Sequence, residues 1–278
     1  MVNPRTDGRL DKLRRYCEQD AKIDPRNFHC KYYGECKSSV STGLTFIPGG
    51  LAHVGEDYDV TLGDQDLRIM FVGYDYGNGS DCLENRRTAI QEYAGHLNPH
   101  YRGIVKVMME IFQVGCDSEG EGHVWRPLLR KMAQTNATRC CASRNGAMRT
   151  NTTREMQQNC WGHFRKEIEI LEPTIIFFHG ARLRQSLMQN LQRGEPNQAP
   201  PTALSQQVGH HCQLIEWTAF SRKFTSALLF FNHPAFGHFG NQWEAKVVPA
   251  LELLREHSLL PAGGKEWRAR GRAKWPPI

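Results

Sequence analysis

The sequence has no long hydrophobic run. Its longest apolar stretches, Ile175–Phe178 and Ala227–Phe231, hold four and five residues, whereas a transmembrane helix needs about 20 apolar residues in a row. The first residues of the chain are polar and lack the apolar core of a signal peptide. We therefore expect a soluble, cytoplasmic protein of bacterial or archaeal type that makes no contact with a membrane.

Compositional bias is missing as well. Apolar residues make up 40% and charged residues 23% of the 278 residues, which is ordinary for a globular protein and excludes a disordered chain, a collagen-like chain and a coiled coil. Neither an internal repeat nor a second domain boundary is visible. We expect a monomer with one domain over residues 1–278, an N-terminal arm over about 1–45 and a basic C-terminal tail over about 258–278.

The excess charge is concentrated at the C-terminus. The chain carries a net charge of +6, and the stretch Lys265–Lys274 has five basic residues against one acidic residue. Trp267 and Trp275 lie within and beside this stretch, and basic residues that alternate with indole rings suit a polyanion with stackable bases. We expect DNA as the partner, with a solvated tail as the alternative. The tail residues assigned to DNA contact are Arg268, Arg270 and Arg272.

Compact apolar runs alternate with stretches of helical spacing. The runs predict strands at Leu67–Gly73, Gln134–Arg139, Thr174–Gly180, Cys212–Trp217 and Ser226–Phe231. Helices are predicted at Arg9–Gln19, Tyr101–Phe112, Trp125–Met132, Arg154–Leu171, Ala181–Gln192 and Asn241–His257. Strands that alternate with helices indicate an α/β fold with a mainly parallel sheet.

Nine cysteines need an explanation, because a disulfide framework is not expected in a reducing compartment. Cys30 and Cys36 lie in a polar, glycine-containing stretch where we expect neither a core strand nor a helix. The adjacent pair Cys140–Cys141 and Cys160 flank a second polar segment. Since adjacent cysteines seldom both bind one metal centre, the pair counts as one ligand. The resulting four are the number that an iron–sulfur cluster or a structural zinc ion requires.

Polar side chains follow three of the predicted strands. Asp75 comes just after the first strand, Asn136 lies in the segment Thr-Asn-Ala-Thr-Arg-Cys, and His233 follows the last strand. In α/β sheets, ligands bind just beyond the carboxyl ends of the strands. A carboxylate, an amide and an imidazole can therefore meet at one mouth of the sheet, although each residue alone is also explained as an ordinary turn or loop residue.

Together and in this order, these motifs resemble the uracil-DNA glycosylase superfamily, in particular its iron–sulfur branch (family 4 and relatives). The segment Thr135–Cys140 is similar to the family's Thr-Asn-x-x-Lys-Cys, and His233–Ala235 is similar to its His-Pro-Ser/Ala loop. The resemblance covers roughly residues 30–255 and implies a three-layer α/β/α sandwich around a mainly parallel sheet. It also implies a [4Fe–4S] cluster, with zinc as the alternative. The cluster ligands implied are Cys30, Cys36, Cys140 and Cys160.

Two features depart from the family's ligand pattern. Five residues separate Cys30 from Cys36, whereas the family's first pair is usually Cys-x-x-Cys. The stretch from Cys140 to Cys160 is also slightly longer than usual, and Cys141 could take the place of Cys140.

The resemblance implies that the protein flips out a pyrimidine-type base and hydrolyses its N-glycosidic bond to leave an abasic site. Asp75 would stabilise the positive charge that develops on the sugar and would orient water, and His233 would donate a hydrogen bond to the departing base. Asn136 would pair with the edge of the flipped base. Tyr101 stands where the family has a Phe that stacks on the base. The three motifs contain no lysine, so no lyase step is indicated.

The loop around Asp75 bears on the choice of base. Gly77 stands where the uracil-strict branch has a Tyr that blocks substituents at the pyrimidine 5-position, and Tyr74 precedes Asp75. We assign Tyr74 and Gly77 to the base-binding set. An open position at Gly77 suits a 5-modified pyrimidine, such as a hypermodified phage base removed in antiviral defence. Uracil, removed in base-excision repair, is the second substrate considered.

A loop after His233 carries Phe236, His238 and Phe239. We expect these side chains to wedge into the duplex or to stack where the base has left; the alternative is an aromatic loop that packs on its own core. Two rival functions stay open at this point. One is a non-catalytic iron–sulfur nucleic-acid-binding protein with the same fold, and the other is a zinc-stabilised hydrolase of a small nucleotide.

Overall fold

A computed structural model describes residues 3–23, 29–74, 99–114, 126–144, 150–180, 183, 187, 206–209, 212–219, 222–231 and 243–262. Its centre is a seven-stranded sheet in the order β2-β6-β5-β8-β11-β10-β9. Its strands are β2 (His53–Val54), β5 (Ile69–Gly73), β6 (Met132–Asn136), β8 (Ile175–His179), β9 (Gln206–Gly209), β10 (Cys212–Ala219) and β11 (Arg222–Phe231). The four central strands are parallel, and β2, β10 and β9 are antiparallel to their neighbours.

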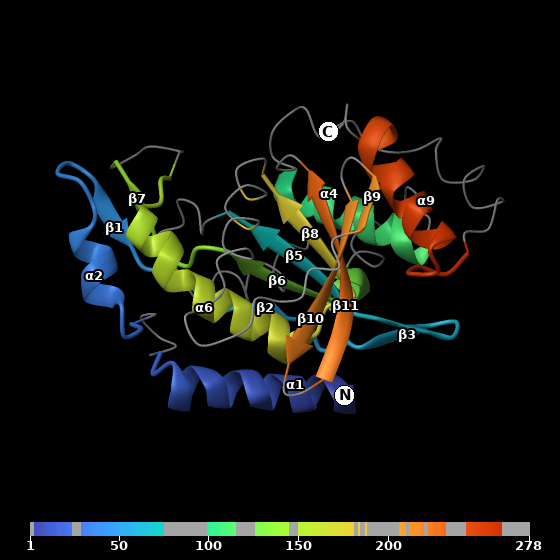
Figure 1. The fold of residues 1–278 in the computed structure, drawn as a ribbon, viewed down its shortest axis with the longest axis horizontal. Helices are drawn as coiled ribbons and strands as arrows, with labels where there is room; N and C mark the ends of the chain where they lie inside the picture. The colour runs from blue at the N-terminus through green and yellow to red at the C-terminus, as the bar shows by residue number, and fades with distance from the viewer. Residues whose placement is uncertain are drawn as a thin grey trace.

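Helices cover both faces of the sheet (Figure 1). One face packs against α4 (Pro99–Phe112) and α9 (Val248–Glu256). The other face packs against α6 (Arg154–Leu171), through side chains such as Phe164 and Ile168. The predicted α/β fold with a mainly parallel central sheet is therefore confirmed.

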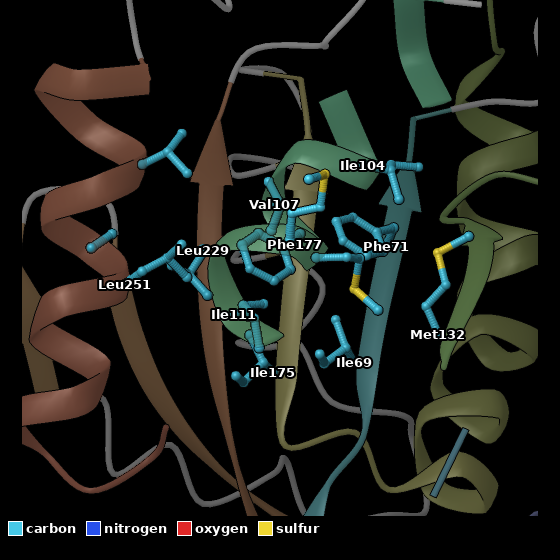
Figure 2. Packing of buried hydrophobic residues seen from close by; sticks show 14 of the residues in the cluster. Ile69, Phe71, Ile104, Val107, Ile111, Met132, Ile175, Phe177, Leu229 and Leu251 are labelled. Atoms are coloured by element: carbon cyan, nitrogen blue, oxygen red, sulfur yellow. The ribbon is translucent and has the colours of Figure 1, made fainter. Parts of the chain in front are cut away.

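The central strands are apolar because both of their faces are buried. Ile69 and Phe71 of β5 and Ile175 and Phe177 of β8 are fully buried, and Figure 2 shows these side chains directed toward α4. The rings of Phe71 and Phe177 stack with their centroids 4.9 Å apart. Apolar packing of this kind fixes the register of the strands, so the residues at their carboxyl ends are held in a defined row.

Helix α6 has the bounds that its apolar spacing predicts. Thr153 caps its N-terminus, where the hydroxyl accepts a hydrogen bond from the backbone N–H of Met156 at 3.1 Å. The helix ends where Glu172 takes a left-handed conformation with φ 45°, and Pro173 follows. Since α6 also carries Cys160, these caps set the position of a predicted metal ligand.

The N-terminal arm packs under the sheet. It forms α1 (Pro4–Arg15) and a π-helical turn, η1 (Tyr16–Asp20), whereas we predicted a helix at Arg9–Gln19. Arg9 anchors α1, because its guanidinium lies 3.1 Å from the carboxylates of both Asp59 and Glu172. Both carboxylates are buried, so the arm is fastened to the sheet and to the end of α6.

A separate small layer lies around the first turns of α6. It consists of α2 (Tyr33–Ser38) and the antiparallel pair β1 (Thr45–Ile47) and β7 (Cys141–Ser143), which gather at one end of α6 in Figure 1. We call this region, together with Cys30, Cys140 and Cys160, the cysteine layer. Cys36 lies on α2, so our expectation that no helix occurs in this stretch was wrong.

Three other predicted elements differ from the structure. Among the described residues of the predicted helix Trp125–Met132, only 126–129 are helical, because Met132 already pairs with β5 as the first residue of β6. Strand β6 ends at Asn136, before the predicted Arg139. The closing helix begins with a π-helical turn, η2 (Trp243–Val247). The predicted helix at 181–192 lies largely outside the described residues.

Six short strands were not predicted: β1, β2, β7, β9, β3 (Val60–Leu62) and β4 (Gln65–Leu67). Strands β3 and β4 form a hairpin. No helix within the described ranges is long and apolar enough to cross a membrane.

Candidate functional site

Four residues end the parallel strands in one register row. Gly73 of β5 is paired with Asn136 of β6 on one side and with His179 of β8 on the other, and His179 is paired with Phe231 of β11. We call Asn136, Gly73, His179 and Phe231 the strand-end row. The three predicted motifs follow or include members of this row, so they leave the sheet from the same edge.

Several predicted site residues lie beyond the strand-end row, outside the described residues. They are Asp75, Gly77, His233, Phe236, His238, Phe239, Arg268, Arg270 and Arg272. The backbone just before Asp75 is nevertheless defined. The N–H of Ala137 donates to the carbonyl of Gly73 at 2.9 Å, and the N–H of Thr138 donates to the carbonyl of Tyr74 at 3.1 Å. The segments after β5 and β6 therefore stay paired beyond the sheet.

Asn136 is the predicted base-reading residue. It is buried with 3% of its surface exposed, and its side-chain Nδ2 has no hydrogen-bond partner among the described residues. A buried donor without a partner costs about 1–3 kcal/mol, and native proteins contain few of them. An amide in this state is suited to receive a polar ligand that supplies the missing acceptor.

Tyr101 lies in the first turn of α4, close to the strand-end row. Its hydroxyl donates to Oε1 of Gln134 at 2.9 Å, and Gln134 precedes Asn136 by two residues on β6. Side chains two residues apart on a strand share a face, so the structure brings Tyr101 and Asn136 to the same face of the sheet. The ring is mostly buried, with 6% exposed.

Tyr74 lies on the opposite face. It packs against the cluster that includes α6, and its hydroxyl accepts hydrogen bonds from Nε2 of Gln157 at 2.7 Å and from Oγ1 of Thr152 at 3.1 Å. The structure therefore does not bring Tyr74 together with Asn136 and Tyr101. Tyr74 instead has a structural role, because these hydrogen bonds connect the start of the Asp75 loop to α6, the helix that carries Cys160.

The four predicted metal ligands come together in the cysteine layer. Cys140 interacts electrostatically with Cys160, Cys36 and Cys30, and Cys36 also interacts with Cys30. Burial is the largest cause of the raised pKa of each thiol, and it raises the pKa of Cys160 to about 11. The adjacent Cys141 pairs with Ile47 in the β1–β7 ladder.

Among the described residues, N–H groups donate hydrogen bonds to two of the four sulfur atoms. The backbone N–H of Arg139 donates to Cys160 at 3.2 Å, and Nδ2 of Asn159 donates to Cys36 at 3.6 Å. The backbone N–H groups of Gly49 and Tyr32 lower the pKa of the thiols of Cys140 and Cys30. For the core residue Cys212, in contrast, burial alone raises the pKa, to about 11.

Gly49 is a member of the cysteine layer that sequence reasoning missed. A Cβ atom at this position would lie 1.5 Å from the carbonyl oxygen of Arg139, so only glycine fits beside the backbone that precedes Cys140. The signal available in the sequence was the Pro48-Gly49-Gly50 turn before the predicted first strand. Glycine is required here for close approach of two backbones.

The donor set suits a thiolate-bound metal centre. Within the described ranges, no three His, Cys, Asp or Glu side chains are grouped so as to hold a single metal ion. The four thiols of the cysteine layer nevertheless have the chemistry that such a centre needs. Metal binding replaces the thiol protons, and N–H donors around the sulfurs stabilise the charge of the thiolates and tune an iron–sulfur cluster. The residues present therefore fit the proposed group.

A buried ion pair joins the cysteine layer to the strand-end row. The guanidinium of Arg139 pairs with the carboxylate of Glu167 on α6, and 1% and 4% of these two side chains are exposed. Both groups also bond to Thr135, since Nη1 of Arg139 donates to Oγ1 at 2.5 Å and that hydroxyl donates to Glu167 at 2.8 Å. Thr135 immediately precedes Asn136, so this network positions β6, the strand of Asn136, against α6, the helix of Cys160.

Comparison with known proteins does not add a family to this geometry. No protein-family model matches the chain, and no curated protein shows a significant match.

Proposed function

We propose that the protein is a monofunctional DNA glycosylase that flips out a pyrimidine-type base and hydrolyses its N-glycosidic bond. The observation that carries this proposal is the strand-end row, from which the Asp75, Asn136 and His233 motifs all leave or begin. The buried N–H of Asn136 that lacks a partner within the described ranges supports it, because an amide can pair with a base edge. The order of the motifs, which resembles that of the iron–sulfur uracil-DNA glycosylases, supports it as well.

The two groups proposed to act on the glycosidic bond start from different strands. Asp75 follows Gly73 of β5 by two residues, and His233 follows Phe231 of β11 by two. β5 and β11 flank β8, so their ends lie roughly 9–10 Å apart. A nucleotide bound at this edge of the sheet would have its sugar near the carboxylate and its departing base within reach of the imidazole. Asp75 would then stabilise the positive sugar and orient water, and His233 would stabilise the negative leaving base.

The proposed cofactor is a [4Fe–4S] cluster held by four thiolates, with zinc as the alternative. Bound there, it would supply a structural cross-link between the arm, α2, the end of β6 and α6. Arg139 and Glu167 would pass this rigidity to Thr135 and Asn136. The ligands proposed are Cys30, Cys36, Cys140 and Cys160.

The proposed substrate is a 5-modified pyrimidine in DNA, such as a hypermodified phage base removed in antiviral defence, with uracil in base-excision repair as the second candidate. Gly77 carries this choice, because it has no ring to occupy the space of a 5-substituent. We propose DNA as the partner of a cytoplasmic monomer. Phe236, His238 and Phe239 would enter the duplex, and the basic tail would contact its phosphates.

The decisive experiment is an assay of base release. Purified protein is incubated with uracil-containing oligonucleotides and with genomic DNA of phages that carry modified cytosines, and free bases and abasic sites are measured. We expect release from at least one of these DNAs. Asp75→Asn and His233→Ala should each lower the rate by roughly 10²- to 10³-fold while DNA binding persists.

The matched control is Asp66→Asn, which removes an exposed carboxylate of β4 that pairs with Arg5 at 2.7 Å. Its rate of base release should equal that of the wild type. Wild-type protein that binds DNA but releases no base would instead favour the non-catalytic nucleic-acid-binding protein.

A further inference from the structure

His179 occupies the centre of the strand-end row, yet the proposed mechanism does not use it. It ends β8 between Gly73 of β5 and Phe231 of β11, so it lies between the strands from which Asp75 and His233 depart. All other residues of β8, Ile175–Phe178, are apolar. Packing alone would be satisfied by another apolar side chain here, so the imidazole calls for a chemical explanation.

The register places His179 opposite Asn136 with only a glycine between them. Gly73 is the partner of both residues, and neighbouring strands lie about 4.8 Å apart. The Cα atoms of Asn136 and His179 are therefore separated by roughly 10 Å. Gly73 adds no side chain between them.

The side chain of His179 lies on the same face of the sheet as Tyr101. Its ring lies 5.6 Å from that of Phe71 and 5.4 Å from that of His100, which it meets edge to face at 85°. Phe71 and Tyr101 both belong to the cluster between the sheet and α4. Asn136, two residues after Gln134, is on this face too, so His179 and the base-reading amide face the same space.

A hydrogen-bond chain orients the imidazole that packs against His179. The Tyr101 hydroxyl donates to Oε1 of Gln134, which directs Nε2 of Gln134 to donate to Nε2 of His100 at 3.0 Å. His100 therefore carries its proton on Nδ1. A residue that is held in this way has a fixed ring orientation. Its edge-to-face contact therefore restricts the orientation of the His179 ring as well.

We propose that His179 is a specificity-determining residue that binds a hydroxyl-bearing substituent at the 5-position of the flipped pyrimidine. This inference rests on the proposed glycosylase function. If Asn136 pairs with the Watson–Crick edge of a ring above Gly73, the opposite edge, which carries C5 and C6, faces His179. An imidazole both donates and accepts hydrogen bonds, which suits a hydroxyl group and gives no advantage to hydrogen or methyl at the same position.

The test compares bases that differ in one hydroxyl group. Oligonucleotides carry 5-hydroxymethyl or 5-methyl versions of uracil and cytosine at one position, with plain uracil alongside, and single-turnover release is measured. The wild type should release at least one 5-hydroxymethyl base 10-fold or more faster than its 5-methyl analogue. His179→Phe should lower that rate roughly 10- to 100-fold and leave the other rates within about 2-fold. His179→Gln, which keeps hydrogen bonding, should restore part of the preference.

Phe177→Leu is the matched control, because Phe177 lies on the same strand and the same face, two residues before His179. It should change all rates by the same factor. The inference is overturned if the wild type shows no preference for the hydroxymethyl base, or if His179→Phe slows every base equally. Release of uracil without that preference would refute only the role of His179, whereas release of no base from any DNA would refute the glycosylase proposal itself.

Discussion

The cysteine layer and the strand-end row are both buried, but they differ in how their polar atoms are satisfied. In the cysteine layer, N–H groups of Arg139 and Asn159 donate hydrogen bonds to Cys160 and Cys36, and N–H groups of Gly49 and Tyr32 lower the pKa of the other two thiols. In the strand-end row, Nδ2 of Asn136 is buried without a hydrogen-bond partner among the described residues. The N–H groups of the first region lower the pKa of its thiols, whereas the second region contains a buried donor that no described residue satisfies.

This difference suggests separate roles for the two regions: the cysteine layer for stability and the strand-end row for ligand binding. The proposed cluster would contribute its binding energy to folding, and the cysteine layer is joined to the row through Arg139, Glu167 and Thr135. The row carries a free-energy cost at Asn136 that a ligand would remove. Mutations in the cysteine layer should therefore lower the stability, whereas mutation of Asn136 should lower base release without lowering the stability. Four predictions test this difference, in order of their expected effect on stability.

The largest effect is expected in the cysteine layer. Cys140→Ser should remove a cluster ligand, so the protein should lose its iron, its brown colour and its cooperative unfolding, because binding energy is folding energy here. Iron and sulfide content and urea unfolding measure these losses. Cys212→Ala, at a buried thiol of the core next to α9 and α4, should keep the iron and lose only packing. A colourless wild type with stoichiometric zinc would favour zinc over the cluster.

The strongest sequence patterns predicted the elements of the core. The apolar spacing of Arg154–Leu171 matches α6 in both bounds, and the apolar runs around Ile69–Gly73 and Ile175–His179 match β5 and β8. Each of these patterns arises within one element, because each element is buried along a defined face. The short strands β1 and β7 could not be predicted, since three residues show no period and each strand depends on a partner almost a hundred positions away.

The candidate site could be predicted only in part, for a related reason. The motifs showed that Asn136 follows a strand, but the spatial order β6-β5-β8-β11 is a property of the assembled sheet, and it places His179 in the row. The one available signal was a single histidine that ends an otherwise apolar strand before Gly180. The orientation of Tyr74 toward α6 depends on Gln157 and was likewise beyond a sequence pattern.

The second prediction concerns the ion pair that links the two regions. Glu167→Gln leaves the charge of Arg139 uncompensated at a site where 1% of that side chain is exposed, so the free energy of unfolding should fall by about 3–5 kcal/mol. Urea unfolding measures this change. Glu216→Gln is the control, because Glu216 pairs with Lys223, whose side chain is 65% exposed, and such pairs contribute less than about 1 kcal/mol. Equal losses in both variants would contradict a linking role.

The third prediction concerns pH. Burial, followed by the charges of Arg139 and Lys31, lowers the pKa of His163 from 6.5 to about 4. The unfolded chain therefore binds a proton at a pH where the folded protein does not, and stability falls as the pH decreases from about 6.5 to 4. The shift corresponds to about 3 kcal/mol.

His163→Gln tests this directly, because an amide side chain can donate or accept and so can still hydrogen-bond to the Tyr16 hydroxyl, which lies 2.7 Å from Nδ1 of His163. Urea unfolding of both proteins is measured from pH 7 to pH 4.5. The difference between the two proteins isolates His163 from other acid-sensitive groups, including the thiolates of the cysteine layer. The variant should lose less stability than the wild type over this range, and parallel pH profiles would contradict the prediction.

The smallest change in stability, with the opposite sign, is expected at Asn136. Asn136→Ala removes a buried donor that has no partner within the described ranges, so the relief of about 1–3 kcal/mol offsets the lost packing and the stability should stay equal or rise slightly. Base release should nevertheless fall roughly 100-fold, and discrimination between bases should weaken, because the amide no longer pairs with the flipped base.

Gln134→Ala is the matched control on the same face of β6. Its amide is bonded to Tyr101 and His100, so this variant should lose about 1–3 kcal/mol. If Asn136→Ala instead destabilises the protein as much as Gln134→Ala does, Asn136 is a structural residue, and its amide is not kept for hydrogen bonding to a ligand.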